Sequence, residues 1–470
     1  MAFPEHLASF DVEALTALLA SRPDLLVEPV PRDVDELAQR LGGTESLSAA
    51  LPVLDRDETV VARTVALLGA ADVATVAHRV AAPTELVAAA VDRLCARGLA
   101  WRDGPEACLP LRLAAHFAGA VEGFRPVRTI GGQVRVEQLR ETVTALGGDP
   151  SGTKTALIEA LERCYADPAV IVRAVEGLSR AAGEHLRLLL GGHHQFGYGG
   201  GPPVELLRAG LLLGGSYGAA ELPREVAVPL LIRGTVTGRP EVAASTDRAD
   251  DGRAGAESAL LALVTVLDDA RVRPIAALKK GGVGARERAR LTKSLRVTEP
   301  ALWIDVTHAA GLLAPTGTGY TATAAYDGWR DQDPGSRWAG VAAAWFELHV
   351  APTSREYHDG EVAPPLHMST GAGILRRALL RAGAGGGSLR SAAEHVEWFC
   401  PMHQDHEFRA KEVDAALREG AALGVVAGDR LTALGELLVT GADDLAARAA
   451  ALLPETRGGV VLQSDLTAVV

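Results

Sequence analysis

Cysteine, aromatic residues and long apolar runs are all scarce in this chain of 470 residues. Its four cysteines, Cys95, Cys108, Cys164 and Cys400, lie far apart, which is typical of a reducing compartment and not of a disulfide scaffold. No apolar run reaches the roughly 18 residues of a membrane helix. The first residues also lack the basic-then-apolar pattern of a signal peptide. We therefore expect a cytoplasmic protein without membrane partners.

Aromatic residues make up only 4% of the chain, so its hydrophobic cores must be built from leucine, alanine and valine. This composition, rich also in arginine and glutamate, favours helix over sheet. The length predicts about three domains. The net charge of −12 argues against nucleic-acid binding over the whole surface. Any contact with DNA must therefore be local.

Helix signals recur along the first hundred residues. Asp11, Asp33 and Asp72 each precede an amphipathic run and can accept hydrogen bonds from its first free N–H groups. The runs at 58–69, 73–80 and 85–98 are followed by a hairpin around residues 103–105. Because helix, helix, turn, helix and hairpin is the order of a winged helix, we interpret residues 57–112 as one such unit.

The end of that unit recurs at intervals of about a hundred residues. Gly98, Gly210, Gly311 and Gly424 each follow a predicted helix and precede two or three apolar residues, a turn and a second short strand. Glycine suits the left-handed position that ends many helices. The repeat predicts a mainly α fold with small β-hairpins, in which tandem winged helix-turn-helix modules are joined by helical inserts.

One segment stands out by its charge. Residues 271–296 hold nine Lys or Arg residues and only one acidic residue, and a predicted helix at 298–310 and the third hairpin follow. Arg286, Arg290 and Lys293 have the spacing of one helix face, with Leu291 and Leu295 on the other. A solvated helix face is the usual fate of such a run, but its one-sided charge in an acidic chain favours contact with double-stranded DNA. The candidate DNA-binding residues here are Lys279, Lys280, Arg286, Arg288, Arg290, Lys293 and Arg296.

Residues 136–165 read as two helices joined by a Gly/Pro turn, and they resemble the SAP motif of DNA-associated proteins. The resemblance rests on Leu139, Leu146-Gly147, Gly152-Thr153-Lys154, Leu157-Ile158 and Leu161. It implies backbone contact with DNA through Lys154. A plain helical hairpin is the alternative interpretation.

Two stretches resemble known kinds of functional site, a nucleotide-binding loop and a zinc site. Residues 147–155 nearly spell a nucleotide-binding loop, but a helix precedes them where such a loop needs a strand. His395, Cys400, His403 and His406 are zinc-ligand types whose spacing matches no closed zinc module. No nucleophile motif or paired-carboxylate pattern stands out. We therefore expect no enzyme, no cofactor and no metal site, with the His/Cys group left open.

The predicted organisation follows from these segments. Residues 237–258 are polar and rich in Gly and Asp, which favours a linker. The last ten residues are predicted to form an apolar strand. The backbone groups at its edge would be unpaired, so we expect it to pair with a partner or with further residues of the chain. The predicted domains are 1–112 with the first winged helix, 113–236 with the SAP-like hairpin and second winged unit, a linker at 237–255, a central winged helix at 256–330, a helical insert at 331–390, a fourth winged unit at 391–450, and the start of a further domain at 451–470.

Several stretches together resemble the actinobacterial helicase-associated proteins, also called helicase C-terminal-domain proteins, which accompany XPB-type DNA-repair helicases. The matching pieces are residues 15–26, 35–41, 201–226, 278–291, 326–345 and 451–469. The resemblance implies tandem winged-helix modules, DNA binding and an XPB-type helicase partner, and it brings no catalytic residues. Family members continue past the last of these pieces, and residues 192–201 (GHHQFGYGGG) depart from the family pattern.

These observations predict a non-enzymatic DNA-binding scaffold that works with a repair helicase. Two alternatives remain open. A protein–protein interaction module would use the same helices with an acidic surface for a basic partner. A sequence-specific transcription regulator would be a dimer with a palindromic site.

Overall fold

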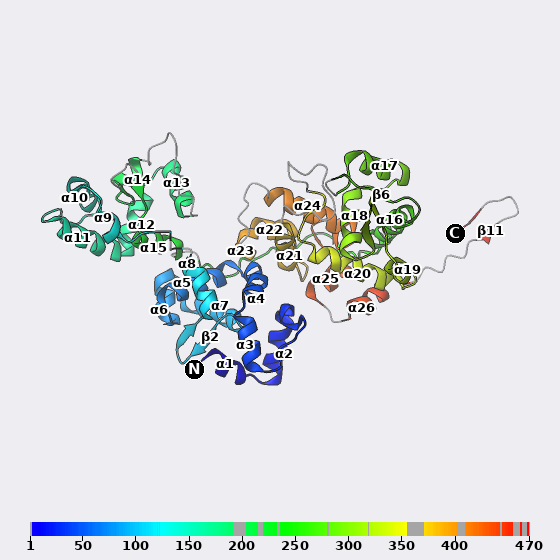
Figure 1. Ribbon diagram of the computed structural model, residues 1–470, viewed down its shortest axis with the longest axis horizontal. Coiled ribbons are helices and arrows are strands. Elements are labelled where there is room, and N and C mark those ends of the chain that lie inside the picture. Colours follow the sequence, from blue (N-terminus) through cyan, green and yellow to red (C-terminus); the bar gives the residue numbers. More distant parts are fainter. Residues whose placement is uncertain are drawn as a thin grey trace. The chain divides into compact units, whose positions relative to one another are not determined.

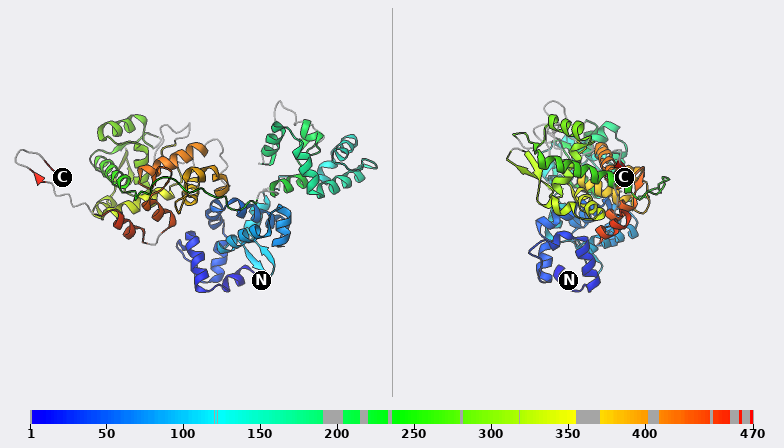
Figure 2. Two further views of the ribbon diagram at one scale, coloured as in Figure 1. Left: turned by 180° about the vertical axis from the view of Figure 1, so that it is seen from behind. Right: turned by 90° about the vertical axis from the view of Figure 1, so that its right-hand side faces the viewer.

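The structure, a computed structural model, describes residues 2–119, 121, 123–190, 204–214, 220–232, 236–279, 282–317, 319–354, 371–401, 409–441, 444–454, 461–462 and 468–469. The chain forms two compact units, which we call unit 1 (residues 1–51 and 55–239) and unit 2 (residues 52–54 and 240–470). Figures 1 and 2 show them in colours that follow the sequence. With 63% helix and 7% strand, the fold is mainly α with small antiparallel sheets, as predicted.

The bounds of the elements are as follows. Up to residue 239 they are α1 (Phe3–Ala8), α2 (Val12–Ser21), η1 (Pro23–Leu26), α3 (Val34–Leu41), α4 (Thr44–Ala50), η2 (Leu51–Val53), α5 (Arg56–Leu68), β1 (Ala71–Asp72), α6 (Val73–Val80), α7 (Thr84–Ala96), β2 (Trp101–Asp103), β3 (Glu106–Cys108), α8 (Leu111–Gly119), α9 (Val127–Gly131), α10 (Val136–Ala145), α11 (Lys154–Ala166), α12 (Pro168–Glu176), α13 (Arg180–Leu190), α14 (Val204–Arg208), β4 (Leu213–Gly214), β5 (Ala220–Glu221) and α15 (Arg224–Ile232).

From residue 240 onward the elements are α16 (Arg253–Val272), β6 (Ile275–Ala276), α17 (Ala285–Leu295), α18 (Pro300–Ala309), β7 (Leu313–Thr316), β8 (Gly319–Ala322), α19 (Ala325–Arg330), α20 (Pro334–Glu347), α21 (Ala372–Ala382), α22 (Leu389–Glu394), α23 (Val396–Phe399), α24 (Arg409–Ala422), β9 (Val426–Ala427), β10 (Arg430–Leu431), α25 (Ala433–Thr440), α26 (Leu445–Leu452), β11 (Val461–Leu462) and β12 (Ala468–Val469).

The three predicted aspartate caps are present. Asp11 begins α2, Asp33 begins α3 and Asp72 begins α6, and each carboxylate accepts a hydrogen bond of 2.8 Å from the backbone N–H three residues on. These bonds satisfy N–H groups that have no partner within the helix. Local sequence alone therefore sets the starts of these helices.

Two segments share one order of elements and one pattern of strand pairing. In unit 1 the order is α5-β1-α6-α7-β2-β3, and in unit 2 it is α16-β6-α17-α18-β7-β8. The first strand pairs with the third in both sheets, giving the antiparallel orders β1-β3-β2 and β6-β8-β7. β1 and β6 have two residues each and were not predicted from the sequence. We call these segments module A (residues 56–108) and module B (residues 253–322).

The four predicted hairpins lie where the glycine repeat places them. They are β2–β3, β4–β5, β7–β8 and β9–β10, all antiparallel. The glycine before each has a φ between +64° and +74°, the left-handed region that other residues rarely adopt. A helix follows each hairpin: α8, α15, α19 or α25.

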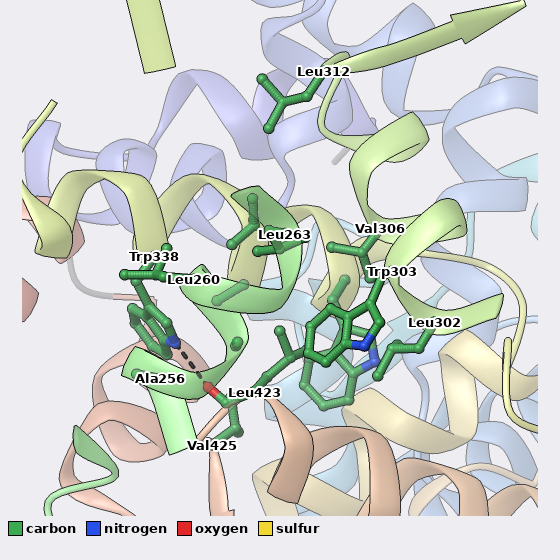
Figure 3. Close-up of a cluster of buried hydrophobic side chains, with 14 of the residues drawn as sticks. Ala256, Leu260, Leu263, Leu302, Trp303, Val306, Leu312, Trp338, Leu423 and Val425 are labelled. Carbon is green, nitrogen blue, oxygen red and sulfur yellow. Dashed lines mark hydrogen bonds between the residues drawn. The ribbon is translucent and has the colours of Figure 1, made fainter. Parts of the chain in front are cut away.

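One hydrophobic core runs through unit 2 from Ala256 to Leu453. Figure 3 shows part of it, where Leu263 and Val306 lie near the ring of Trp303. Trp338, which is fully buried, donates from Nε1 to the carbonyl of Leu423 at 2.8 Å. The predicted domains at 256–330, 331–390 and 391–450 all contribute to this core. Trp329, Trp338 and Trp345 are all buried.

The boundary between the units lies inside the predicted linker, after residue 239. Much of that segment nevertheless belongs to unit 2. Ser388 N–H donates to the Ala243 carbonyl at 2.8 Å, and Asp429 N–H donates to the Asp247 carboxylate at 2.7 Å. Residues 243–251 thus run along unit 2 as extended chain. Their polar composition is typical of a linker, but backbone N–H groups of unit 2 donate hydrogen bonds to their carbonyls and carboxylates.

The C-terminal residues differ from the single strand expected. β11 and β12 are two short strands that pair antiparallel with each other. The stretch at 192–201 lies outside the described residues.

Candidate nucleic-acid interface

A glycine-rich turn positions α17, the helix of the basic segment. Gly282 has a φ of +81°, and its N–H lies 3.2 Å from the hydroxyl oxygen of Tyr320 on β8. The Leu278 N–H donates to the Gly282 carbonyl at 2.9 Å. α17 begins directly after this turn, at Ala285. The turn therefore fixes the start of α17 to the sheet of module B.

The exposed face of α17 carries cations and small side chains. Arg286 and Lys293 are exposed, as is Arg296 at the C-terminal end of the helix. Ala289 lies between the first two and is also exposed. Within the described ranges, no carboxylate pairs with any of these three cations. The predicted inner face is confirmed in part, since Leu291 is fully buried and Leu295 is half-buried.

Arg290 corrects the predicted cationic face. Its side chain is only 14% exposed, and it pairs with Asp269 at 2.8 Å and with Glu287 at 2.7 Å. The hydrogen bond to Asp269 raises the pKa of Arg290 above its ordinary value. Arg290 therefore joins α17 to α16 and does not stand beside Arg286 and Lys293 in solvent. The i, i+4, i+7 spacing alone could not reveal this, because Asp269 comes from another helix.

The remaining candidates of this segment differ in exposure. Lys279 is exposed on the turn before α17, and Lys280 lies outside the described residues. Arg288 is half-buried and donates to the Val283 carbonyl at 2.7 Å. Arg273, which sequence analysis did not single out, is exposed after α16. The segment thus presents six exposed cations in the described part of the chain: Arg271, Arg273, Lys279, Arg286, Lys293 and Arg296. Arg271 pairs with Asp327 at 2.6 Å.

α18 follows α17 in the position that a winged helix gives to its groove-reading helix. Among residues 300–309, only Ala309 is exposed. Trp303 is 4% exposed and donates from Nε1 to the Thr298 carbonyl at 2.8 Å. The buried residues of α18 include Leu302 and Val306, which belong to the core of unit 2. In this structure α18 is an internal helix.

α7 is the corresponding helix of module A, and its exposed face is acidic. Glu85 and Asp92 are exposed. Its two arginines point elsewhere: Arg93 pairs with Asp55 at 3.0 Å, and Arg97 lies 3.5 Å from Glu58. This acidic face was not predicted from the sequence, although residues 84–96 contain no lysine.

Lys154 lies in unit 1, away in sequence from the basic segment. It starts α11 in the hairpin α10–α11, so the predicted pair of helices at 136–165 is present. Its Nζ donates to the Gly132 carbonyl at 2.7 Å. Lys154 is half-buried, and this hydrogen bond within the protein uses one of the three N–H donors of its ammonium group.

Of the two stretches that resemble chemical sites, the structure describes residues 147–155 and, from the His/Cys group, His395 and Cys400. Thr153 caps α11, and helix α10 precedes its loop. Burial raises the pKa of the Cys400 thiol to about 12, and its Sγ donates to the Val396 carbonyl at 3.2 Å. His403 and His406 lie outside the described residues, and no group of three metal-ligand residues occurs within them.

None of the helices in the described ranges is long and apolar enough to cross a membrane. No protein-family model, curated protein or solved structure matches the chain.

Proposed function

We propose that this chain is a non-enzymatic DNA-binding scaffold built on winged-helix modules. The shared order of modules A and B supports the module type, because helix–strand–helix–helix–hairpin with the first strand paired to the third is the winged-helix arrangement. The observation that carries DNA binding is the group of exposed cations on and around α17.

Exposed, unpaired cations are the groups that meet phosphates. Arg286, Lys293 and Arg296 are exposed and have no carboxylate partner among the described residues, in a chain whose net charge is −12. Each phosphate contact releases counterions from DNA, so affinity falls as salt rises. The acidity of the remaining chain confines this attraction to the basic segment.

The test is binding of duplex DNA by the full chain, measured by fluorescence anisotropy over a range of salt concentrations. We expect the observed binding constant to fall with salt, with a slope of about −0.9 for each phosphate contact. Charge reversal of Arg286, Lys293 and Arg296 to glutamate is expected to abolish binding. A wild-type chain that binds no duplex at roughly 50 mM salt would exclude this function.

A helicase partner is the second part of the proposal, and its support is the resemblance in sequence. Purified chain and an XPB-type helicase, mixed with and without duplex, are expected to co-elute in gel filtration. Separate elution under both conditions would leave the scaffold without this partner.

A protein-interaction role is the alternative, and one observation favours it. The exposed carboxylate of Glu85 on α7 offers a basic partner a complementary charge, whereas that of Asp92 pairs with Arg102 at 2.6 Å. Stable complexes with a basic protein that are lost when Glu85 is changed to lysine, in a chain that binds no DNA, would support this function instead.

A further inference from the structure

The central module has two helices that could meet DNA, and the structure distinguishes between them. A helix that reads bases must have a free side that enters the major groove, about 12 Å wide. α18 has no such side, because its residues from Ala301 to Thr307 are all buried. The chain itself covers this helix.

The cover over α18 consists of core elements. Leu302 and Val306 belong to one continuous hydrophobic core with Leu263 of α16 and Trp338 of α20 (Figure 3). Opening α18 to a groove would expose this core.

α17 has the opposite character. Arg286 and Lys293 are seven residues apart, so they stand about 10 Å apart along its axis. The small side chains of Ala285, Ala289 and Thr292 allow a backbone to approach closely between them. Residues 285–295 contain no Asn or Gln, the side chains that pair with adenine, and their exposed cations, Arg286 and Lys293, can contact either phosphates or the edge of guanine.

We infer that α17, with Lys279 and Arg296 on its flanks, is the element of module B that lies against duplex DNA, and that it holds the phosphate backbone without reading sequence. The inference rests on the proposed DNA binding and adds the element and the mode. Phosphate contacts position a protein on DNA but carry no sequence information. Such a module suits a scaffold that must bind wherever its partner works.

The test compares two triple variants that lose the same charge. The first is Arg286→Ala, Lys293→Ala and Arg296→Gly; glycine is chosen at position 296 because its φ is +55°. The control is Arg248→Ala, Arg390→Ala and Arg448→Ala, three exposed arginines elsewhere in unit 2. Both are measured against a panel of duplexes of equal length and unrelated sequence.

For the wild-type chain we expect affinities within about threefold across the panel, whereas sequence readers prefer their site by about a thousandfold or more. The α17 variant is expected to reduce the salt slope by about 2.7 and the control by less than about 1. If the triple variant is poorly folded by circular dichroism, Arg286→Ala and Lys293→Ala alone should each reduce the slope by about 0.9.

Three outcomes are distinguishable. Wild-type binding that is unaffected by the α17 substitutions overturns the assignment to α17 and leaves DNA binding intact. A preference of a hundredfold or more for one duplex overturns the sequence-neutral mode. A wild-type chain that binds none of the duplexes overturns the proposed function, and this inference falls with it.

Discussion

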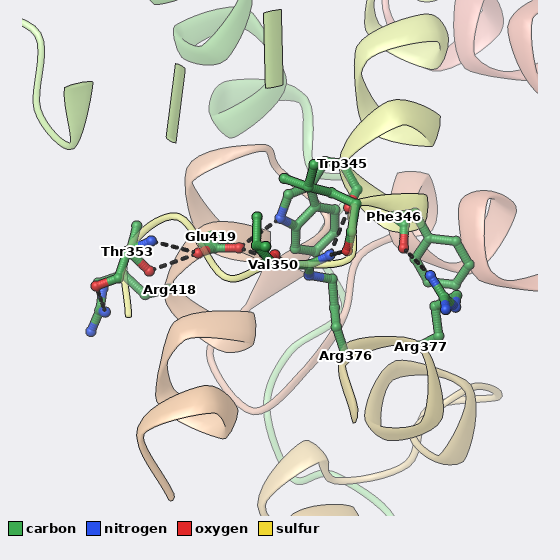
Figure 4. Close-up of polar contacts among 9 residues, drawn as sticks. Trp345, Phe346, Val350, Thr353, Arg376, Arg377, Arg418 and Glu419 are labelled. Carbon is green, nitrogen blue, oxygen red and sulfur yellow. Dashed lines mark hydrogen bonds and ion pairs between the residues drawn. The ribbon is translucent and has the colours of Figure 1, made fainter. Parts of the chain in front are cut away.

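At the scale of single residues, the most demanding position is Arg376 on α21, which is 1% exposed. Figure 4 shows its guanidinium beside the ring of Trp345 and the carboxylate of Glu419. It donates to the carbonyls of Trp345 and Leu348 at 2.8 Å and pairs with Glu419 at 3.2 Å. Burial lowers the pKa of Arg376, and the charge of Glu419 opposes that shift. The network ties the chain after α20 to α21 and α24.

Removal of Arg376 should therefore destabilise unit 2 severely. We expect Arg376→Ala to reduce the free energy of unfolding by about 3–5 kcal/mol, because the buried Glu419 charge loses its partner. The exposed Arg390→Ala should change the free energy by no more than about 0.5 kcal/mol. Urea denaturation measures both. A loss below about 1 kcal/mol for Arg376→Ala would contradict this account of the network.

A second charged network lies in unit 1. Arg22 is 2% exposed and pairs with Asp24 at 2.9 Å, and Ser46 donates to the same carboxylate at 2.6 Å. Burial alone raises the pKa of Asp24, but hydrogen bonds from Arg22 and Ser46 and the charge of Arg22 outweigh it, so the pKa is lowered overall. A carboxyl whose pKa is lowered by folding stabilises the protein when it is ionised.

This shift gives a pH-dependent prediction for Asp24→Asn. The stabilisation by Asp24 is present above the unfolded pKa of about 3.9 and is lost as the pH falls through the lower folded value. We expect the variant to be less stable than wild type by about 2 kcal/mol at pH 7, and the difference to shrink below about pH 4. Chemical denaturation at both pH values checks this. A difference that stays constant down to pH 3 would contradict it.

At the scale of elements, the four hairpin glycines share a backbone conformation but not their surroundings. A Cβ on Gly311 would meet no atom within 4 Å. A Cβ on Gly424 would lie 2.4 Å from the carbonyl oxygen of Gly252 and 2.5 Å from the amide nitrogen of Ala256. The first glycine is required by its φ alone, and the second also by the close approach of α16.

Alanine substitutions should separate these two requirements. Gly311→Ala should cost about 1–2 kcal/mol, the penalty of the left-handed conformation. Gly424→Ala should cost clearly more, because backbone atoms must move as well. Gly340→Ala, at an exposed site inside α20, should stabilise by about 0.5–1 kcal/mol. Thermal unfolding orders the three variants, and equal losses for Gly311 and Gly424 would contradict the role of the close approach.

Sequence predicted those elements that local interactions determine. The aspartate caps at positions 11, 33 and 72 and the hairpin glycines depend on residues within one turn of each other, so their spacing is readable. β1 and β6 were missed because a two-residue strand has no periodicity of its own. Their partners, Ala107 and Tyr320, lie more than 30 residues further along the chain.

The candidate site was predictable to the same extent. The exposure of Arg286 and Lys293 follows from helix periodicity. The pairing of Arg290 with Asp269 and the burial of α18 do not, because both depend on helices packed from distant parts of the sequence. Periodicity identifies an apolar face, but it does not tell whether a second element covers the opposite face too.

At the scale of the whole molecule, the two units have hydrophobic cores of their own. The main core of unit 2 is built from residues 256–453, whereas unit 1 contains separate clusters at residues 3–41 and 121–227. Each core is expected to unfold cooperatively with the helices and strands that form it, and independently of the other cores. A single two-state transition for all 470 residues is therefore not expected.

Calorimetry of the full chain should show at least two transitions. The variants Arg376→Ala and Asp24→Asn identify which unit unfolds in each. Arg376→Ala is expected to lower the melting temperature of one transition, because the hydrogen-bond and ion-pair partners of Arg376 among the described residues lie in unit 2. Asp24→Asn is expected to lower another, because its partners Arg22 and Ser46 lie in unit 1. The double variant should show both shifts, added together, because sites without shared partners are additive. If each substitution instead lowered every transition by the same amount, the two units would have to unfold as one cooperative body.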